Sequence, residues 1–287
     1  MAERTQPAHA VLLAGLVAVA LALTGGGAAW AWWQATAAAE SPPALSAASV
    51  DVQVVGLGGG LPGPGGTVTL PALSLTGAFP GGGDSEVVTV RNAGSRTTTV
   101  TAAMSRTGTL GAVFTTTATF GGTDSGAGCT GGNGSTTTIA AGGTATLCLA
   151  VGLSATAPTG TQGQSGGVTT TLAASLPGTS WTDEGTVVSG AVGAGTVPAT
   201  SLSCGALGVL SVRFNWTSVP GATSYVLRYG TNGSQSETLT VTTRRFTSAL
   251  SGGTAWVVTQ RNFGQVTWSS VPSNTRSYTV AVVSLCG

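Results

Sequence analysis

The chain has 287 residues, only 7% of them charged, and a formal net charge of +1. Phosphate binding needs clustered basic residues, so this charge balance excludes a nucleic-acid partner, and the low net charge favours self-association. With 46 glycines and frequent threonine and serine, the surface must consist of hydroxyls and backbone rather than ion pairs. All ten basic residues are arginine, which with the heavy alanine, glycine and threonine usage is typical of a bacterium with a GC-rich genome.

The first 39 residues have the features of an export segment. An apolar run from Ala10 to Leu23 follows a short polar start that contains Arg4, and small residues in A-x-A patterns come next. This is the order of a secretory signal peptide. An uncleaved membrane anchor is the alternative, because no charge occurs from Ala10 to Trp33 and about 20 apolar residues can cross a bilayer. We therefore predict residues 1–39 to be a signal peptide or anchor, which places the protein outside the cell or on its surface.

A Pro/Ala/Ser-rich linker over residues 40–48 leads into an alternating segment. Within residues 49–55, Val50, Val52 and Val54 fall on one face. An open sheet edge can accept a strand from a neighbouring molecule. The segment is therefore a candidate donor strand for assembly.

Short strand-like segments with Gly- and Ser-rich turns between them predict a β-sandwich over residues 49–198. They cover residues 67–75, 86–91, 97–104, 113–120, 136–139, 144–153 and 167–175. A region rich in Gly, Ala and Val follows over residues 185–200, and we place the domain boundary near its end. No part of the chain after the export segment has a convincing helical period.

The last 89 residues, 199–287, alternate more cleanly. Phe214 and Trp216 point one way with Val212, and Tyr225 and Leu227 belong to a second inward set, which is the period of a half-buried strand. The predicted fold class is therefore all-β, with two tandem β-sandwich domains after the N-terminal hydrophobic export helix.

Four cysteines form an even set in an exported chain, which favours disulfides over free thiols. Their placement favours the pairs Cys129–Cys148 and Cys204–Cys286, one in each predicted domain. A metal site is the rival interpretation, but the chain has no C-x-x-C motif, and its single histidine, His9, lies in the export segment. We predict disulfides, no metal and no cofactor.

The C-terminal region resembles a fibronectin type III domain. The resemblance rests on Phe214-Asn215-Trp216 and on the sequence PGATSYVLRY at residues 220–229. It implies that Trp216 and Tyr225 are core residues, and Phe214 and Leu227 are expected beside them.

The N-terminal part resembles the TasA/camelysin family of exported proteins. The Gly-rich, Trp-rich end of the export segment (residues 24–33), Phe79-Pro80-Gly81 and the sequence DSEVVTVRNAGS at residues 84–95 carry the resemblance. It implies a jelly-roll-like sandwich and a role in surface or biofilm-matrix fibres. Camelysin-like proteins are also labelled metalloproteases, but a mature chain without histidine cannot build an H-E-x-x-H zinc site.

Two further sequence features could suggest an enzyme, and each has a simpler explanation. The sequence GQSGG at residues 163–167 fits the nucleophile-elbow motif G-x-S-x-G, but no histidine base follows it. Asp183 and Glu184 are adjacent, so on a strand they would face opposite ways and could not flank one glycosidic bond. We expect no enzyme activity and no catalytic residues.

The leading hypothesis is a secreted or surface-attached structural protein of the cell surface or biofilm matrix that self-associates or binds other matrix proteins. The alternative is an adhesin or carbohydrate-binding module that contacts cell-wall glycan. For that role Trp268 is the best candidate among the tryptophans, because polar residues surround it. Packing of the ring in the core is the competing explanation.

Overall fold

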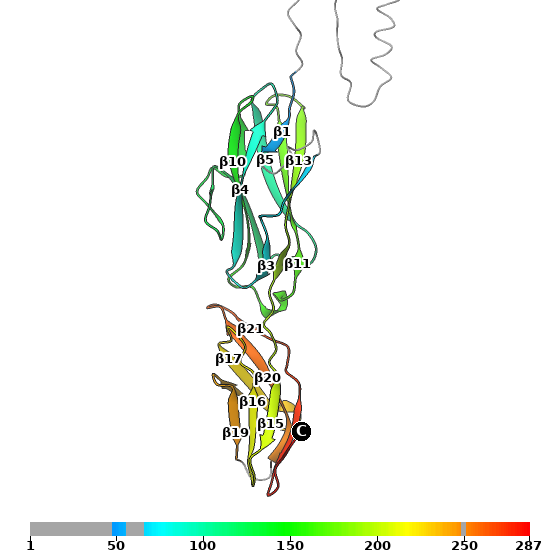
Figure 1. Cartoon of the computed structure of the whole chain (residues 1–287). Coiled ribbons are helices and arrows are strands. Elements are labelled where there is room, and N and C mark those ends of the chain that lie inside the picture. Colours follow the sequence, from blue (N-terminus) through cyan, green and yellow to red (C-terminus); the bar gives the residue numbers. More distant parts are fainter. Residues whose placement is uncertain (1–47, 56–65, 248–250) are drawn as a thin grey trace, which may run out of the picture. The chain divides into compact units, whose positions relative to one another are not determined.

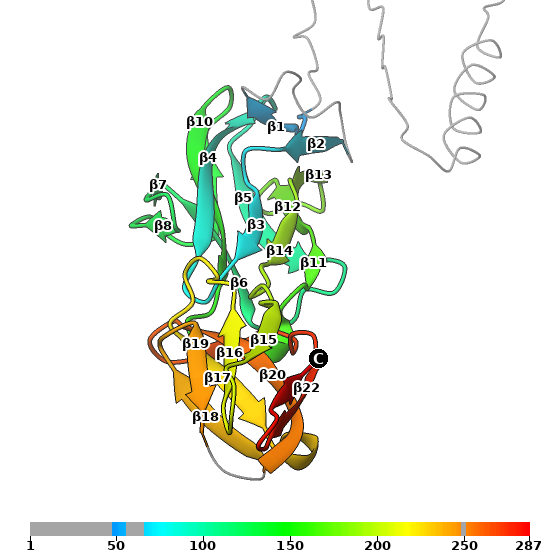
Figure 2. The same cartoon turned by 60° about the horizontal axis from the view of Figure 1, so that its bottom comes forward.

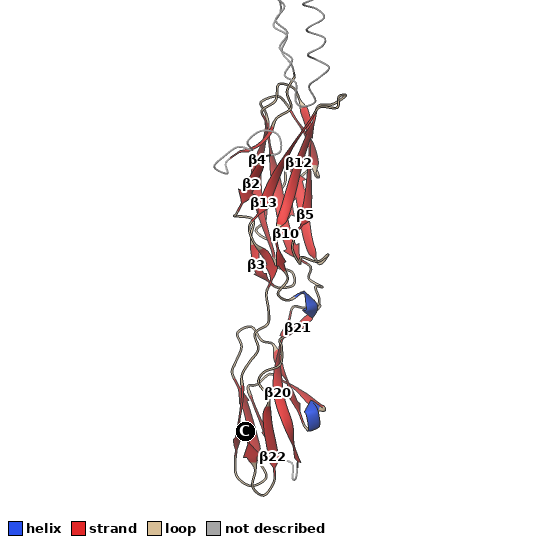
Figure 3. Ribbon diagram, turned by 90° about the vertical axis from the view of Figure 1, so that its right-hand side faces the viewer, coloured by secondary structure: helices blue, strands red, loops and turns tan. Residues whose placement is uncertain are grey.

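The computed structural model describes residues 48–55, 66–247 and 251–287, and residues 48–287 form one compact unit (Figure 1). The predicted export segment and nearly all of the predicted linker lie outside the described residues. Among the described residues, no helix has the length and apolar character needed to span a membrane. The described part of the chain is almost entirely β, which confirms the predicted fold class. Its two helices are single 3₁₀ turns, η1 (Thr159–Thr161) and η2 (Thr231–Gly233) (Figure 3).

The first sandwich is built from a four-stranded sheet of order β1-β4-β10-β6 and a five-stranded sheet of order β2-β13-β12-β5-β9. A small sheet, β11-β14-β3, and the hairpin β7–β8 complete it. All pairs are antiparallel except β2–β13 and β3–β14, which are parallel. The strands are β1 (Val52–Val55), β2 (Thr67–Leu70), β3 (Leu75–Ala78), β4 (Gly83–Asn92), β5 (Thr98–Arg106), β6 (Phe114–Phe120), β7 (Thr123–Asp124), β8 (Cys129–Thr130), β9 (Thr136–Ile139), β10 (Thr144–Leu153), β11 (Ser165–Gly166), β12 (Val168–Ser175), β13 (Thr182–Ser189) and β14 (Val192–Ala194).

The second sandwich has one sheet of order β15-β16-β19 and another of order β18-β17-β20-β22-β23, with β21 paired to β20 (Figure 2). Its inward sets follow the alternation of the sequence, so that Val212, Phe214 and Trp216 of β16 are buried while the residues between them are exposed. The strands are β15 (Leu202–Ala206), β16 (Val212–Trp216), β17 (Ser224–Tyr229), β18 (Gln235–Leu239), β19 (Thr243–Phe246), β20 (Ser251–Asn262), β21 (Thr267–Ser269), β22 (Arg276–Val280) and β23 (Leu285–Cys286).

Two hydrophobic clusters fill these sandwiches. The first takes residues from both large sheets of the N-terminal sandwich, such as Val90 and Leu149 from one and Val100 and Leu172 from the other. The second is centred on Phe214 and the other buried side chains of the C-terminal sandwich. Because both clusters belong to one compact unit, the domain boundary after residue 198 stays a prediction.

In the N-terminal sandwich the sequence prediction differs from the structure mainly at two strands, and in the C-terminal sandwich the 12-residue strand β20 was not predicted. The predicted strand 67–75 is two strands, β2 and β3, because the chain turns at Pro71 and the backbone N–H of Ser74 donates to the Asp84 carboxylate at 2.7 Å. Strand β13 was not predicted. Two of its inward residues are Asp183 and Ser189, which lack the apolar signal of a buried strand face.

The prediction of a free donor strand at Val50, Val52 and Val54 is wrong for this structure. Val52 and Val54 lie in β1, which pairs with β4 of the same chain, and both side chains are buried. Val50 precedes the strand and is partly buried against the same core. The segment completes its own sandwich because the alternating valines cover the core. The backbone N–H of Val52 also donates to the buried carboxylate of Asp183 at 2.9 Å.

Candidate interaction surfaces

Asp183 and Ser165, two residues from the candidate chemical motifs, lie in strands of the sandwich. Asp183 points inward and holds β1, whereas Glu184 is exposed on the other face of β13, as their adjacency predicts. Ser165 belongs to the two-residue strand β11, where the structure has no strand-to-helix turn. Within the described ranges, no three His, Cys, Asp or Glu side chains are grouped in a way that could hold a metal ion.

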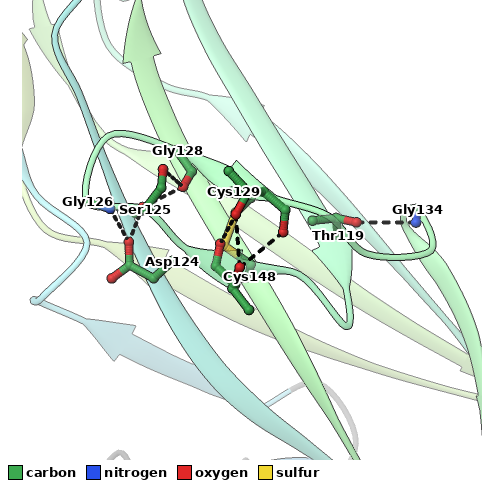
Figure 4. Close-up of a disulfide and its surroundings, with 11 residues drawn as sticks. Thr119, Asp124, Ser125, Gly126, Gly128, Cys129, Gly134 and Cys148 are labelled. Atoms are coloured by element: carbon green, nitrogen blue, oxygen red, sulfur yellow. Dashed lines mark hydrogen bonds between the residues drawn. A yellow bond between two sulfur atoms is a disulfide. The ribbon is translucent and has the colours of Figure 1, made fainter.

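Cys129 and Cys148 form a disulfide with a Cα–Cα distance of 5.8 Å, which attaches the β7–β8 hairpin to the four-stranded sheet. Figure 4 shows the hairpin, with Asp124, Gly126 and Gly128, beside β10, which carries Cys148. The hairpin covers part of the outer face of the sheet. Strand β10 is therefore buried on both faces from Leu147 to Val151, and Cys148 is fully buried.

Polar contacts reinforce the covered face. The hydroxyl of Ser85, on β4, is buried, donates to the Asp124 carboxylate and lies 3.0 Å from the Gly128 carbonyl oxygen. A Cβ atom at Gly83 would collide with the carbonyl oxygen of Ala127, so a side chain there is excluded. The hydrogen bond from Ser85, and next that from the Gly126 backbone N–H, lower the pKa of Asp124 below its ordinary value.

The outer face of the five-stranded sheet has a different composition, and we call it the hydroxyl face. It comprises the sixteen residues that alternate with the buried ones on β2, β13, β12, β5 and β9, none of which is itself buried. Ten are threonine and two are serine, and the only charge is Glu184. The residues are Thr67, Thr69, Thr99, Thr101, Ala103, Ser105, Thr136, Thr138, Thr169, Thr171, Ala173, Ser175, Thr182, Glu184, Thr186 and Val188.

These side chains lie in rows across the strands. One row runs Thr138, Thr99, Ser175 and Thr182, and another runs from Ala103 through Thr171 and Thr186 to Thr67. Figure 3 shows β2, β13, β12 and β5, which carry most of the face.

Few of the hydroxyls have protein partners. In the described part of the chain, the Thr101 and Thr136 hydroxyls bond to each other at 3.1 Å, and Ser105 makes a 3.5 Å contact with the Thr169 carbonyl oxygen. The other nine hydroxyls of the face have no hydrogen-bond partner among the described residues. They are therefore available to an external ligand or to water.

Trp268, the candidate for a binding residue, is fully buried, so the binding role is wrong and the competing explanation, packing of the ring in the core, is confirmed. It lies on β21, which pairs antiparallel with the C-terminal end of the long strand β20, and its ring belongs to the first hydrophobic cluster. The indole N–H donates to the Ala157 carbonyl oxygen at 2.8 Å, and the ring lies against Phe79 and Phe263. Of the polar neighbours that suggested exposure, Ser269 bonds to the region of η1, where its N–H donates to Thr159 Oγ1 at 2.9 Å. The hydroxyl of Ser270 donates to the Val271 carbonyl oxygen at 2.7 Å.

The exposed tryptophan of the described region is Trp181, with 48% of its surface accessible. It lies in the turn between β12 and β13, immediately before Thr182 of the hydroxyl face. The backbone N–H of Leu176 donates to the Trp181 carbonyl oxygen at 3.0 Å and closes this turn.

The four residues predicted for the C-terminal core are placed inside the second cluster. Phe214, Trp216, Tyr225 and Leu227 are all buried, and the Trp216 and Tyr225 rings lie 5.8 Å apart in a T-shaped arrangement. The second predicted disulfide, Cys204–Cys286, joins β15 to β23.

A third surface lies near that disulfide, where the β15–β16 turn meets the β22–β23 turn. The backbone N–H of Leu210 donates to the Ala281 carbonyl oxygen at 2.9 Å, and that of Ser211 donates to the Ser284 hydroxyl at 3.1 Å. Five large aliphatic side chains on these two turns and on β23 are 40–73% exposed, and we call them the apolar tip. They are Leu207, Val209, Val282, Val283 and Leu285.

Sequence reasoning missed both the hydroxyl face and the apolar tip. The first has a visible signal, because threonines recur at every second residue in Thr67-x-Thr69, Thr99-x-Thr101 and Thr136-x-Thr138. Only the strand order shows that these pairs share one surface. The tip has no such signal, because it combines residues 207–209 with residues 282–285.

Comparison with known proteins identifies no family. No protein-family model matches the chain, and no curated protein sequence matches it. Among solved structures, the YadV chaperone aligns at 11% identity with a TM-score of 0.30, covering 79% of this chain and 99% of that one. The Pseudomonas aeruginosa CupB2 chaperone aligns at 14% identity with a TM-score of 0.26, covering 76% of this chain and 99% of that one. The chicken CNTN1 FN1-FN3 domains align at 12% identity with a TM-score of 0.27, covering 74% of this chain and 66% of that one. At these TM-scores the alignments establish no relationship, and the TasA/camelysin resemblance stays a prediction.

Proposed function

We propose that this chain is an exported, non-catalytic structural protein of the bacterial cell surface or extracellular matrix, and that it self-associates. Export is supported by the N-terminal segment and by the pairing of all four cysteines, because disulfides persist in oxidising compartments. A matrix-fibre role of the TasA/camelysin kind agrees with the resemblance of residues 84–95. The proposed structural role requires no catalytic activity.

The observation that carries self-association is the apolar tip. Solvent-exposed apolar side chains that gather in one place mark association surfaces, whereas scattered ones are ordinary. The backbone bonds between the two turns hold Val209 and Val282–Val283 at the same end of the sandwich. A net charge of +1 offers little repulsion against such contacts.

The test is the mass of the exported protein in solution, measured by light scattering over a range of concentrations and compared with electron microscopy. We expect concentration-dependent oligomers or fibres, and their loss in the variant Val282→Glu/Val283→Glu. The matched control is Val271→Glu, because Val271 is as exposed as Val283 (72% against 73%) but lies outside the tip. A protein that stays monomeric at high concentration, or oligomers that both variants retain, would refute assembly through the tip.

A further inference from the structure

The hydroxyl face combines three properties that point to a ligand of one chemical class. The first is hydrogen-bonding capacity without internal partners. Each threonine or serine hydroxyl offers one donor and two acceptor lone pairs, and nine of the twelve on this face have no protein partner within the described residues. A ligand rich in both donors and acceptors would match that capacity.

The second property is the near absence of charge. No arginine lies on the face, and Glu184 is the single carboxylate among its sixteen residues. An anionic polymer would find no cation to contact and one repulsive group, so the charge balance favours a neutral ligand.

The third property is repetition in two directions. Outward residues recur every second position along each strand, about 7 Å apart, and every strand across the sheet, about 5 Å apart. The register aligns the rows, as in Thr171↔Thr186 and Thr186↔Thr67. A repeating polymer can use such a grid at several sites at once, and weak single contacts then add up to useful affinity.

We propose that the hydroxyl face binds a neutral, extended polysaccharide whose hydroxyl groups repeat along its length. Trp181 lies at one end of the face, where an exposed indole can stack on a sugar ring. The inference goes beyond self-association and uses a different sandwich from the apolar tip. Its failure and that of the proposed function are therefore distinguishable.

The test is depletion of the exported protein from solution by microcrystalline cellulose and by chitin, two insoluble neutral polysaccharides. We expect the wild type to bind at least one of them. The variant Thr171→Glu/Thr186→Glu changes two neighbouring residues of the face whose hydroxyls have no partner within the described residues. It should bind about tenfold more weakly or worse, since a few lost hydrogen bonds correspond to about that factor. The isosteric variant Thr171→Val/Thr186→Val should lose affinity in the same direction, because only the hydroxyls are removed.

The matched control is Thr117→Glu/Thr144→Glu, which places the same charges at exposed positions of the four-stranded sheet. It should bind like the wild type, and the melting temperatures of all variants should confirm folding. Absence of wild-type binding to both polymers overturns the proposal, as does equal binding by the face variants and the control. A face variant that changes only the oligomeric mass would assign the face to self-association. One that changes only adsorption to ice would assign it to ice binding. Either result overturns the polysaccharide proposal.

Discussion

The two large sheets of the N-terminal sandwich have similar inner faces and contrasting outer ones. Inside, both contribute buried aliphatic residues such as Leu149 and Leu172. Outside, the β7–β8 hairpin covers part of the four-stranded sheet, and the Cys129–Cys148 disulfide and Ser85 hold it in place. The five-stranded sheet instead presents its threonine rows without a comparable cover among the described residues.

The contrast shows that a hydroxyl has a different role on each side. On the covered part of the four-stranded sheet, the hydroxyls of Ser85 and Thr119 have protein partners and contribute to the stability of the fold. On the hydroxyl face most hydroxyls have no partner within the described residues, so they add little to stability and are available for binding. Substitutions on the two faces should therefore differ in their effects on stability.

Removal of the covering disulfide by Cys129→Ala/Cys148→Ala should have the largest effect. The loop-entropy model gives a loss of about 3 kcal/mol in the free energy of unfolding for a loop of this length. Urea unfolding measures the loss, and amide hydrogen exchange should show residues 121–135 exchanging faster. Removal of Cys204–Cys286 is the control, and it should leave the exchange of residues 121–135 unchanged. Equal protection of the hairpin in both variants would contradict the role of the disulfide.

The substitution Ser85→Ala should have the next largest effect on stability. The buried hydroxyl bonds to the Asp124 carboxylate, and its loss should cost about 1–2 kcal/mol in the free energy of unfolding. Ser105→Ala, on the hydroxyl face, is the matched control and should change stability by less than about 0.5 kcal/mol. Equal effects of the two substitutions would remove the distinction between the faces.

A pair of threonine substitutions compares the faces more directly. The Thr119 hydroxyl accepts a bond from the Gly134 backbone N–H at 3.2 Å, so Thr119→Val should cost about 1 kcal/mol in the free energy of unfolding. The Thr171 hydroxyl has no partner within the described residues, and Thr171→Val should leave that free energy within about 0.5 kcal/mol of the wild type. Denaturant midpoints of both variants provide the measurement. A large cost at Thr171 would show that the hydroxyl face serves folding.

The smallest expected effect is the pH dependence of the hairpin. Because the pKa of Asp124 is lowered in the folded protein, its contribution is present above the ordinary aspartate pKa of 3.8 and is lost as the pH falls through the lower folded value. Amide exchange in residues 121–130 should therefore accelerate relative to the hydroxyl-face strands only below that pKa. Asp124→Asn should remove this acid-dependent change. An unchanged pH profile in the variant would assign the change to another group.

The all-β class and the two sandwiches could be predicted because the alternation of apolar and polar residues can be read within each strand. Both disulfide pairs could be predicted from the number of cysteines and their positions in the sequence. The sequence could not predict β13, whose inward side includes Asp183 bonded to the distant Val52. Trp268 shows the same limit, because local polarity indicates exposure, whereas the ring packs against Phe79 and bonds to Ala157, both more than one hundred positions away. Both surfaces proposed for binding depend on strand order and turn contacts that alternation does not specify.

The most direct test of the difference between the two faces is NMR of the exported protein with ¹³C-labelled threonine methyl groups, titrated with cellohexaose. We expect shift changes confined to threonines of the hydroxyl face, such as Thr99, Thr101 and Thr171, with Thr117 on the opposite sheet unaffected. Shift changes at Thr117 equal to those at Thr171, or none at either, would contradict this expectation.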